Sequence, residues 1–265
     1  MQLKYETRQI GTDNGILKMT VVRPCRQTRR LPGLMWIHGG GYFLGGSYMV
    51  RFSRAKDIAR QLGAVVVSPD YRLAGNAPYP AALEDCYAAL AYMFDHADGL
   101  GMDKSHISVG GESAGGGLTA ALCMLARDKG AYRIRSQLPL YPMIDCEDTD
   151  SSRDNHAHAW NTKRNHFGWK KYLAGLDPSR PIPPYASPSR QTLYHDLPPA
   201  YTFVCDGEPF YCETLTYIRN LQSAGVDAAV DVYHANTHSF DMLCPWLKVS
   251  REAKQNLIKR AAQLL

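Results

Sequence analysis

A serine between two glycines follows an apolar run near the middle of the chain. Residues 111–115 read Gly-Glu-Ser-Ala-Gly directly after Ile107-Ser108-Val109, and a helix-like pattern follows over 114–129. This order predicts a sharp turn from a strand into a helix, which lifts the serine clear of the sheet. Glycines suit the flanking positions because a side chain there would collide with the neighbouring strand and helix. The turn requires a fold in which strands alternate with helices, and it makes Ser113 a candidate nucleophile.

A second glycine-rich segment fits the same kind of site. Residues 38–41 read His-Gly-Gly-Gly directly after the apolar run 34–37. The main-chain N–H groups of such a loop can stabilise the negative charge that develops on a carbonyl oxygen under attack. Either motif alone is a moderate indication. Together, each after a strand-like run and in this order, they predict a site that attacks the carbonyl carbon of an ester.

The serine needs a base, and the base needs an acid to orient it, in the chain order serine, acid, histidine. His238 is the expected base because it lies in a short loop after the strand-like run Ala229–Tyr233, where it can reach back over the serine. The acid should follow the preceding strand-like run, Tyr201–Cys205. Two carboxylates, Asp206 and Glu208, are available there. Asp206 could instead cap a turn.

Together with these motifs, three further segments resemble one known family. They read Asp-Tyr-Arg-Leu-Ala at 70–74, Tyr-Pro-Ala-Ala-Leu-Glu-Asp at 79–85 and Leu-Pro-Pro-Ala at 197–200. The chain is similar to the hormone-sensitive-lipase-like group of α/β-hydrolases, the acetylesterase and short-chain carboxylesterase kind. The resemblance runs from about residue 34 to about residue 241, so it covers most of the chain.

The resemblance implies a role for each matching residue. Ser113 becomes the nucleophile and His238 the base. The family acid usually precedes a proline, and that position here is Glu208, which lies 30 positions before His238, so the resemblance favours Glu208 over Asp206. The main-chain donors of the family's oxyanion hole correspond to Gly40, Gly41 and Ala114.

The chain departs from the family pattern in three places. Gly75-Asn76 stands where the family usually has Pro-Glu, and Ser239 stands where a glycine usually follows the base. The largest departure is at the front, where 37 residues precede His38 and two expected strands, Leu3–Ile10 and Ile16–Val22, use most of them. We therefore expect a reduced cap, without the helical N-terminal cap of many members.

Length and patterning agree with one α/β-hydrolase domain over residues 1–265. Apolar runs of four to six residues alternate with helix-length patterns, which indicates a mostly parallel sheet covered by helices on both faces. The resemblance implies eight strands. The expected helices are 50–62, 80–97, 114–129, 165–174, 211–224 and 247–264.

The segment 145–185 has two interpretations. It is rich in polar and aromatic residues, and in the family the equivalent insertion forms part of the cap over the serine. It could instead be a surface excursion whose Trp169 and Tyr172 only anchor one helix. Loops after parallel strands commonly bind ligands in α/β proteins. The residues we expect to contact substrate are Tyr42, Trp160 and Phe210.

Other features of the sequence argue against further functions. His156, His158 and His166 lack the spacing of a zinc site, so no metal is expected. The seven scattered cysteines suit reduced thiols in a cytoplasm. With a net charge of only +5 and no long apolar run, we expect neither nucleic acid nor a membrane as a partner, and no secretion signal.

The sequence therefore predicts a cytoplasmic serine esterase that cleaves short acyl esters, acetyl to butyryl, of a small-molecule substrate without a cofactor. The alcohol part stays open among an acetylated sugar, an aryl ester and a lipid fragment. A homodimer would cover an exposed aromatic rim around the site. Two alternatives remain at this stage: a serine peptidase or amidase on the same fold, and a non-catalytic hydrolase-fold receptor.

Overall fold

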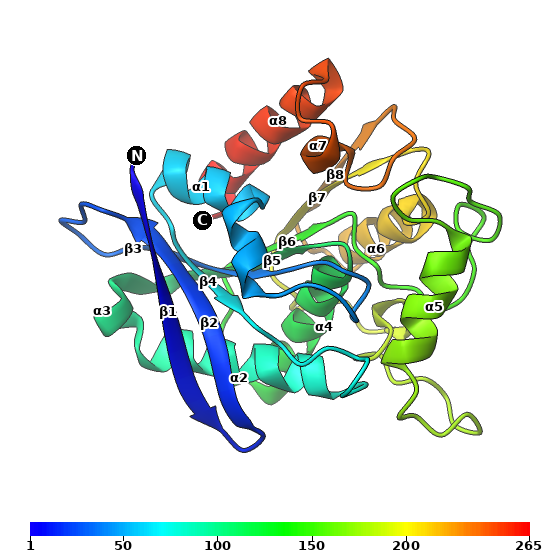
Figure 1. The fold of residues 1–265 in the computed structure, drawn as a ribbon, viewed down its shortest axis with the longest axis horizontal. Coiled ribbons are helices and arrows are strands. Elements are labelled where there is room, and N and C mark those ends of the chain that lie inside the picture. The colour runs from blue at the N-terminus through cyan, green and yellow to red at the C-terminus, as the bar shows by residue number, and fades with distance from the viewer.

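The centre of the computed structural model, which describes residues 1–265, is an eight-stranded β-sheet (Figure 1). The strands are β1 (Leu3–Thr12), β2 (Gly15–Pro24), β3 (Leu31–Ile37), β4 (Val65–Pro69), β5 (Met102–Glu112), β6 (Gln137–Leu140), β7 (Ala200–Cys205) and β8 (Ala228–Tyr233). Their order across the sheet is β1-β2-β4-β3-β5-β6-β7-β8. β2 runs antiparallel to both of its neighbours, and every later pair is parallel. The predicted mostly parallel eight-stranded sheet is confirmed.

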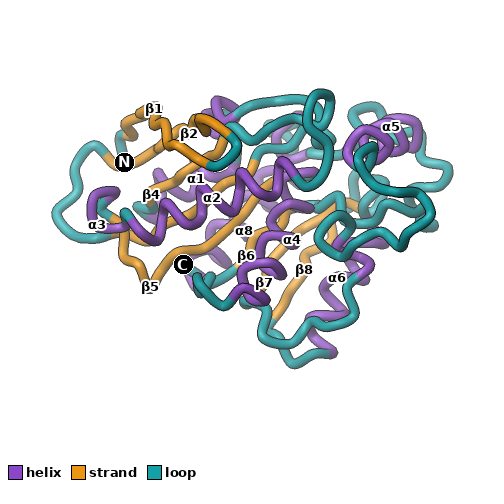
Figure 2. Tube along the Cα trace, turned by 90° about the horizontal axis from the view of Figure 1, so that it is seen from below, coloured by secondary structure: helices purple, strands orange, loops and turns teal.

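Helices cover both faces of this sheet, as Figure 2 shows from below. The α-helices are α1 (Arg54–Leu62), α2 (Ala81–Asp95), α3 (Ala97–Leu100), α4 (Ala114–Lys129), α5 (Thr162–Tyr172), α6 (Tyr211–Ser223), α7 (Phe240–Leu243) and α8 (Lys248–Leu264), and short 3₁₀ helices form at Ser47–Arg51 and Pro188–Arg190. No helix combines the length and the apolar composition needed to cross a bilayer.

Two hydrophobic cores follow from the alternation of side chains along the central strands. In β4, Val65 and Val67 belong to a core of 45 buried residues under α2, α4 and α6. Val66, between them, belongs to a core of 21 buried residues under α1 and α8. Successive side chains of a strand point to opposite faces, so an unbroken apolar run such as β4 serves both cores. Buried on both faces, these strands hold the loops at their ends in fixed positions.

The predicted helices form, with the largest boundary error at the start of α1, and one strand was missed. Residues 50–62 were expected as one helix, but the 3₁₀ helix Ser47–Arg51 ends first and α1 begins after Ser53. Ser53 accepts a hydrogen bond from the N–H of Ala55 at 3.2 Å and so caps the new helix. β4 has no counterpart among the predicted ranges, because its short apolar run carries no period that separates strand from helix.

Both ends of the sheet have distinct roles. The loops that follow β3, β5, β6, β7 and β8 all leave from the carboxyl ends of parallel strands, so they meet at one end of the sheet. β2 runs the other way, and the exposed Cys25 that follows it lies at the opposite end. The segments 38–41, 111–115 and 206–239 are therefore brought together from distant parts of the chain.

The segment 145–185 extends from this same end after β6. Its one helix, α5, begins after Asn161, whose side chain accepts a hydrogen bond from the N–H of Arg164 at 3.2 Å. Figures 1 and 2 both show α5 at one extremity of the molecule, beyond the end of the sheet. Trp169 and Tyr172 of α5 are buried against the ring of Tyr42, so the segment packs on the glycine loop.

Candidate active site

Ser113 occupies the turn between β5 and α4 with a φ of 57°, a value that residues with side chains rarely adopt. Its N–H donates to the carbonyl oxygen of Leu140 on β6 at 3.0 Å, which fixes the turn to the sheet. A Cβ atom on Gly111 would lie 2.5 Å from the carbonyl oxygen of Ile37, and one on Gly115 would lie 2.0 Å from the same atom. Both contacts are impossible, so the turn requires these two glycines.

The structure brings Ser113, His238 and Glu208 into one hydrogen-bonded chain. His238 Nε2 lies 2.9 Å from Ser113 Oγ, and His238 Nδ1 is hydrogen-bonded to Glu208 Oε2. The other oxygen of Glu208 accepts from the N–H of Cys205 at 3.0 Å. All three side chains are buried, with Ser113 and His238 each 5% exposed and Glu208 fully covered. In this order a carboxylate orients an imidazole that can take the proton of a hydroxyl.

The alternative acid, Asp206, lies elsewhere. Its side chain pairs with His234 at 2.7 Å and accepts from the N–H of Ala235 at 3.2 Å. His234 is exposed to solvent, so this pair is separate from the buried chain of groups. The structure thus places Glu208, and not Asp206, beside His238.

The three glycines after β3 lie against the strand-to-helix turn at residues 111–115, called the elbow below. A Cβ atom on Gly39 would be 2.9 Å from the carbonyl oxygen of Glu112, so the loop and the elbow are in contact. The N–H groups of Gly40 and Gly41 donate to no acceptor within the protein. Ala114 is the first residue of α4, where the N–H has no partner in the helix. These three expected donors are therefore free to bind an oxygen atom next to Ser113.

The residues expected to contact substrate take three different positions. Trp160 leans over the loop: a Cβ atom on Gly41 would lie 2.1 Å from its indole, and its rings lie 6.5 Å from the imidazole of His238. Phe210 is fully buried, and its ring packs edge-on against the imidazole of His238 with 5.0 Å between the ring centres, so it supports the base. The structure does not bring Tyr42 to the site.

Tyr42 is 1% exposed, and its hydroxyl donates to the carbonyl oxygen of Met143 at 2.6 Å. Its ring stacks on that of Tyr172 at 3.9 Å. Its φ of 69° turns the side chain inward, between the glycine loop and α5. A single sequence gives no indication of this turn, and the expected substrate contact is replaced by a structural one.

Two buried ionisable side chains flank the loop and the elbow. His38 stacks on the ring of Tyr71 at 4.1 Å, and burial lowers the pKa of its imidazole to about 4, so it is neutral at neutral pH. Glu112 accepts hydrogen bonds from the indole N–H of Trp36 at 2.9 Å and from the main-chain N–H of Arg54 at 3.0 Å. Burial raises the pKa of Glu112 to about 7 despite these bonds. Both residues support the local structure.

Sequence reasoning missed the residues that join Glu112 to the His238 loop. Arg54 and Asp241 are buried beside the elbow and bond to each other at 2.6 Å. They are 187 positions apart and belong to no local motif. Nothing in the spacing of the chain could have paired them.

The histidines of the 145–185 segment form separate surface pairs. His156 lies 2.9 Å from Asp154, and His166 lies 2.8 Å from Asp148, with all four side chains well exposed. No group of three or more His, Cys, Asp and Glu side chains gathers in an arrangement that could hold a metal ion.

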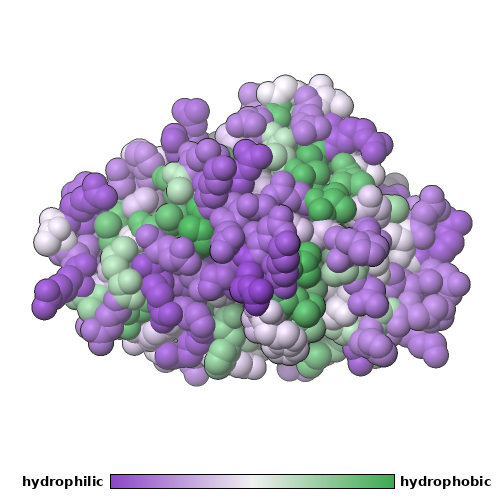
Figure 3. Space-filling view, turned by 90° about the horizontal axis from the view of Figure 1, so that it is seen from above, coloured by the Kyte–Doolittle hydropathy of each residue, from purple (hydrophilic) through white to green (hydrophobic).

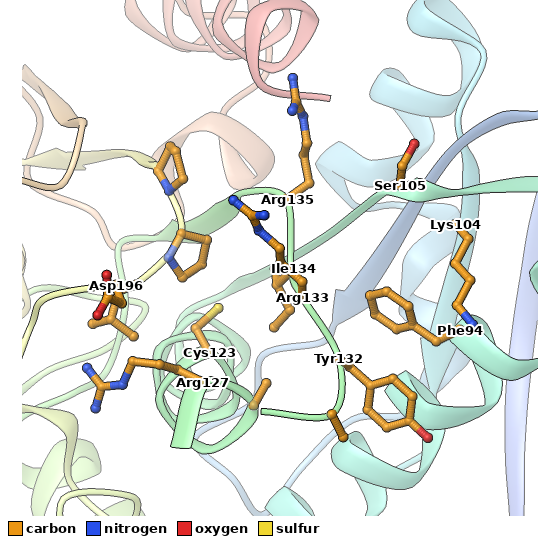
Figure 4. Close-up of a pocket in the computed structure, with 15 residues that line it drawn as sticks. Phe94, Lys104, Ser105, Cys123, Arg127, Tyr132, Arg133, Ile134, Arg135 and Asp196 are labelled. Atoms are coloured by element: carbon orange, nitrogen blue, oxygen red, sulfur yellow. The ribbon is translucent and has the colours of Figure 1, made fainter. Parts of the chain in front are cut away.

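A cavity of about 990 Å³ lies far from Ser113 (Figure 4). Its walls come from the start of β5 near Lys104 and from the segments that precede β6 and β7, near Ile134 and Pro198, so it lies at the amino end of the sheet. Figure 4 shows Arg133 and Arg135 extending from the connection between α4 and β6 at its edge. None of the residues brought together around Ser113 lines this cavity.

Comparison with known proteins places these features in a family. A family model described as alpha/beta hydrolase fold matches residues 34–242. Carboxylesterase NlhH of Mycobacterium tuberculosis is 33% identical over 247 residues, which are 90% of this chain and 76% of the relative.

Among solved structures, a bacterial heroin esterase superposes with a TM-score of 0.94 at 31% identity, over 99% of this chain and 84% of its own. An esterase of Pyrobaculum calidifontis superposes with a TM-score of 0.90 at 32% identity, over 98% of this chain and 85% of its own. The matched region contains both glycine motifs and all three residues of the hydrogen-bonded chain. The chain therefore belongs to the α/β-hydrolase fold family, in its hormone-sensitive-lipase-like group, and it is a carboxylesterase.

Proposed function

We propose that the protein hydrolyses short-chain acyl esters, from acetyl to butyryl, through an acyl-enzyme on Ser113. The observation that carries the proposal is the buried chain from Ser113 Oγ to His238 Nε2, at 2.9 Å, and from His238 Nδ1 to Glu208. His238 takes the proton of Ser113 as the hydroxyl oxygen attacks the ester carbonyl carbon. Glu208 holds the tautomer with a proton on Nδ1 and stabilises the imidazolium that forms.

The negative charge of the tetrahedral intermediate then falls on the former carbonyl oxygen. The free N–H groups of Gly40, Gly41 and Ala114 would donate to it, helped by the positive end of the α4 dipole. His238 gives its proton to the departing alcohol, which leaves the acyl group on Ser113. A water molecule, deprotonated by His238 in turn, attacks this ester and releases the acid.

The simplest test replaces the nucleophile and the base. Because the two act as one unit, Ser113→Ala and His238→Ala should each remove nearly all turnover of p-nitrophenyl butyrate. The loss should be on the order of 10⁶-fold, as for the same changes in a serine protease. The double variant should be scarcely worse than either single one. Activity like that of the wild type in folded Ser113→Ala would refute the proposal.

We propose further that the 145–185 segment is a cap that limits the acyl group within one domain spanning 1–265. Trp160 stands over Gly41, and Phe43, two residues on, meets Phe167 of α5 edge-to-face at 5.0 Å. This aromatic wall leaves one side of the loop closed. Short acyl groups fit such a boundary, whereas long chains would have little apolar surface to bury against.

Kinetics over p-nitrophenyl esters from C2 to C12 test the acyl range. We expect kcat/KM to be highest between C2 and C4. In a long apolar tunnel each buried CH₂ would instead add about 0.8 kcal/mol, or roughly a fourfold gain per carbon. Trp160→Ala, which removes a buried part of this wall, should move the optimum to longer chains. An optimum at C8 or longer in the wild type would contradict the short-chain assignment.

The proposal includes a homodimer and a cytoplasmic location. Leu243, Trp246 and Leu247 are 51%, 68% and 43% exposed, and Figure 3 shows apolar patches among hydrophilic surface on the side that carries α7 and α8. A second copy would cover such patches. Sedimentation equilibrium should give about twice the chain mass of 29.5 kDa. All seven cysteines are free, as suits a reducing compartment, and cell fractionation tests that location.

A further inference from the structure

Three ionisable side chains are buried beside the elbow, and no step of the proposed mechanism uses them. Arg54, Glu112 and Asp241 are 6%, 4% and 0% exposed. Burying charges costs free energy even when they are paired, so their presence beside the reacting groups calls for an account. They come from α1, the end of β5 and α7, three elements that are far apart in the sequence.

The side chain of Arg54 is hydrogen-bonded to Asp241, close to the loop that carries the base. Its Nε donates to Asp241 Oδ2 at 2.6 Å, and one terminal nitrogen donates to the main-chain carbonyl oxygen of the same residue. Asp241 follows His238 by three positions. A guanidinium that bonds to both the side chain and the main chain of one residue fixes its orientation as well as its distance.

The main chain of Arg54 is hydrogen-bonded to Glu112 in the elbow. Its N–H donates to Glu112 Oε1 at 3.0 Å, and Glu112 directly precedes Ser113. The second oxygen of Glu112 accepts from Trp36 Nε1 on β3 at 2.9 Å, so the carboxylate is itself held by the sheet. One residue therefore links the neighbour of the nucleophile to the loop of the base.

The loop of the base needs such a restraint. Ser239, next to His238, has a φ of 57° and a ψ of 34°, the left-handed conformation that favours glycine. A residue held in this region persists only when its surroundings impose it. Besides Arg54, two side chains anchor the main chain around His238: the hydroxyl of Ser250 donates to the carbonyl oxygen of Phe240 at 3.1 Å, and the thiol of Cys205 donates to that of Thr237 at 3.5 Å.

We propose that Arg54 is a positioning residue of this esterase, which sets the distance between Ser113 and His238 by tying Glu112 to Asp241. The proposal rests on the roles proposed above for Ser113 and His238. Arg54 touches no reacting atom. It acts by keeping the imidazole within hydrogen-bonding reach of the hydroxyl during each turnover.

The main test is Arg54→Met, which removes both guanidinium hydrogen bonds to Asp241 and leaves the main-chain hydrogen bond to Glu112 in place. Displacing a catalytic group by about 1 Å can cost roughly 10²-fold in rate, so we expect kcat to fall by about that factor. KM should change less than about twofold, because the loop does not hold the substrate. Arg54→Lys, which keeps the charge but not the planar fork, should restore part of kcat.

Lys254→Met is a matched control. Lys254 pairs with Asp57 at 2.8 Å, and Asp57 also accepts from Arg54 at 2.8 Å, so this change disturbs the same ionic cluster without touching the loop or the elbow. It should leave kcat unchanged. Exhaustive labelling with a fluorophosphonate counts the folded, reactive sites in each variant, and kcat is expressed per site. A merely structural role would lower the number of sites and leave kcat per site intact.

Arg54→Met leaves the buried carboxylate of Asp241 without its cation, so the variant could fail to fold. Arg54→Met/Asp241→Asn removes both charges and keeps the test possible, while Arg54→Lys keeps a cation beside both carboxylates. A kcat per site within about threefold of the wild type in folded Arg54→Met or Arg54→Met/Asp241→Asn would overturn the positioning role. If Ser113→Ala is inactive at the same time, only this inference fails. If Ser113→Ala stays active, the proposed function fails first.

Discussion

The acid proposed to orient His238 gives the sharpest prediction, because the chain holds a matched pair of carboxylates two positions apart. Glu208 is fully buried and bonds to His238, whereas Asp206 bonds to the exposed His234. Changing each to its amide removes one charge and almost no volume. The two variants therefore differ in the environment of the carboxylate and in little else.

The structure indicates why Glu208→Gln should be severe. The carboxylate accepts from two donors, the N–H of Cys205 at 3.0 Å and Nδ1 of His238. A glutamine has one acceptor oxygen for these two donors. If the oxygen faces Cys205, the amide NH₂ faces Nδ1 and favours the tautomer with a proton on Nε2. That tautomer cannot accept the proton of Ser113.

We expect kcat to fall by roughly 10³–10⁴-fold, as for other triad acids, which corresponds to about 4–5 kcal/mol of transition-state stabilisation. Asp206→Asn removes a surface contact with the exposed His234, which contributes little to stability and nothing to turnover. Its kcat should stay within about twofold. Initial rates with p-nitrophenyl butyrate measure both variants, and thermal melting confirms that each is folded. If Asp206→Asn lost more activity than Glu208→Gln, the acid would be misassigned.

Two further predictions concern the glycine loop. Gly41→Ala places a Cβ atom 2.1 Å from the indole of Trp160 at a φ of 60°, so the loop must shift. We expect kcat to fall by roughly 10²–10³-fold, the usual cost of losing one oxyanion donor, and an unchanged kcat would show that Gly41 is not part of the oxyanion hole. His38 has a folded pKa of about 4 against an ordinary 6.5, so the unfolded chain binds a proton between these values that the folded chain does not, and stability falls on acidification by up to about 3 kcal/mol. His38→Asn should lack this loss of stability in urea titrations between pH 7 and 4. The two proteins must be compared with each other, because Glu112, with its pKa raised to about 7, makes the stability of both rise on acidification. Parallel curves of stability against pH would contradict the role of His38.

The reacting groups could be predicted because their constraints are local. The turn at Ser113 needs glycines at 111 and 115, and the measured close approaches to Ile37 explain both. The position of His238 follows from the order of strands, since β8 lies at the edge of the sheet. Glu208 could be favoured over Asp206 only through the family resemblance, because both carboxylates follow the same strand.

The contacts that support the site could not be predicted in this way. Arg54 and Asp241 are brought together because α1 and α7 both pack against α8, and a single sequence carries no trace of that contact. Tyr42 was misplaced for a related reason. Its positive φ depends on the stacking of Tyr172 from α5, and the sequence does not show which face of α5 meets the loop.

The reversed direction of β2 has a practical consequence for handling the enzyme. β2 ends at the amino end of the parallel strands, so Cys25 lies across the sheet from Ser113, and it is the only exposed cysteine of the seven. A maleimide linker at this thiol would attach every molecule to a bead or an electrode in one orientation, with the ester-binding end turned to the solution. Coupling through lysines would give many orientations, because lysines occur on both sides of the molecule.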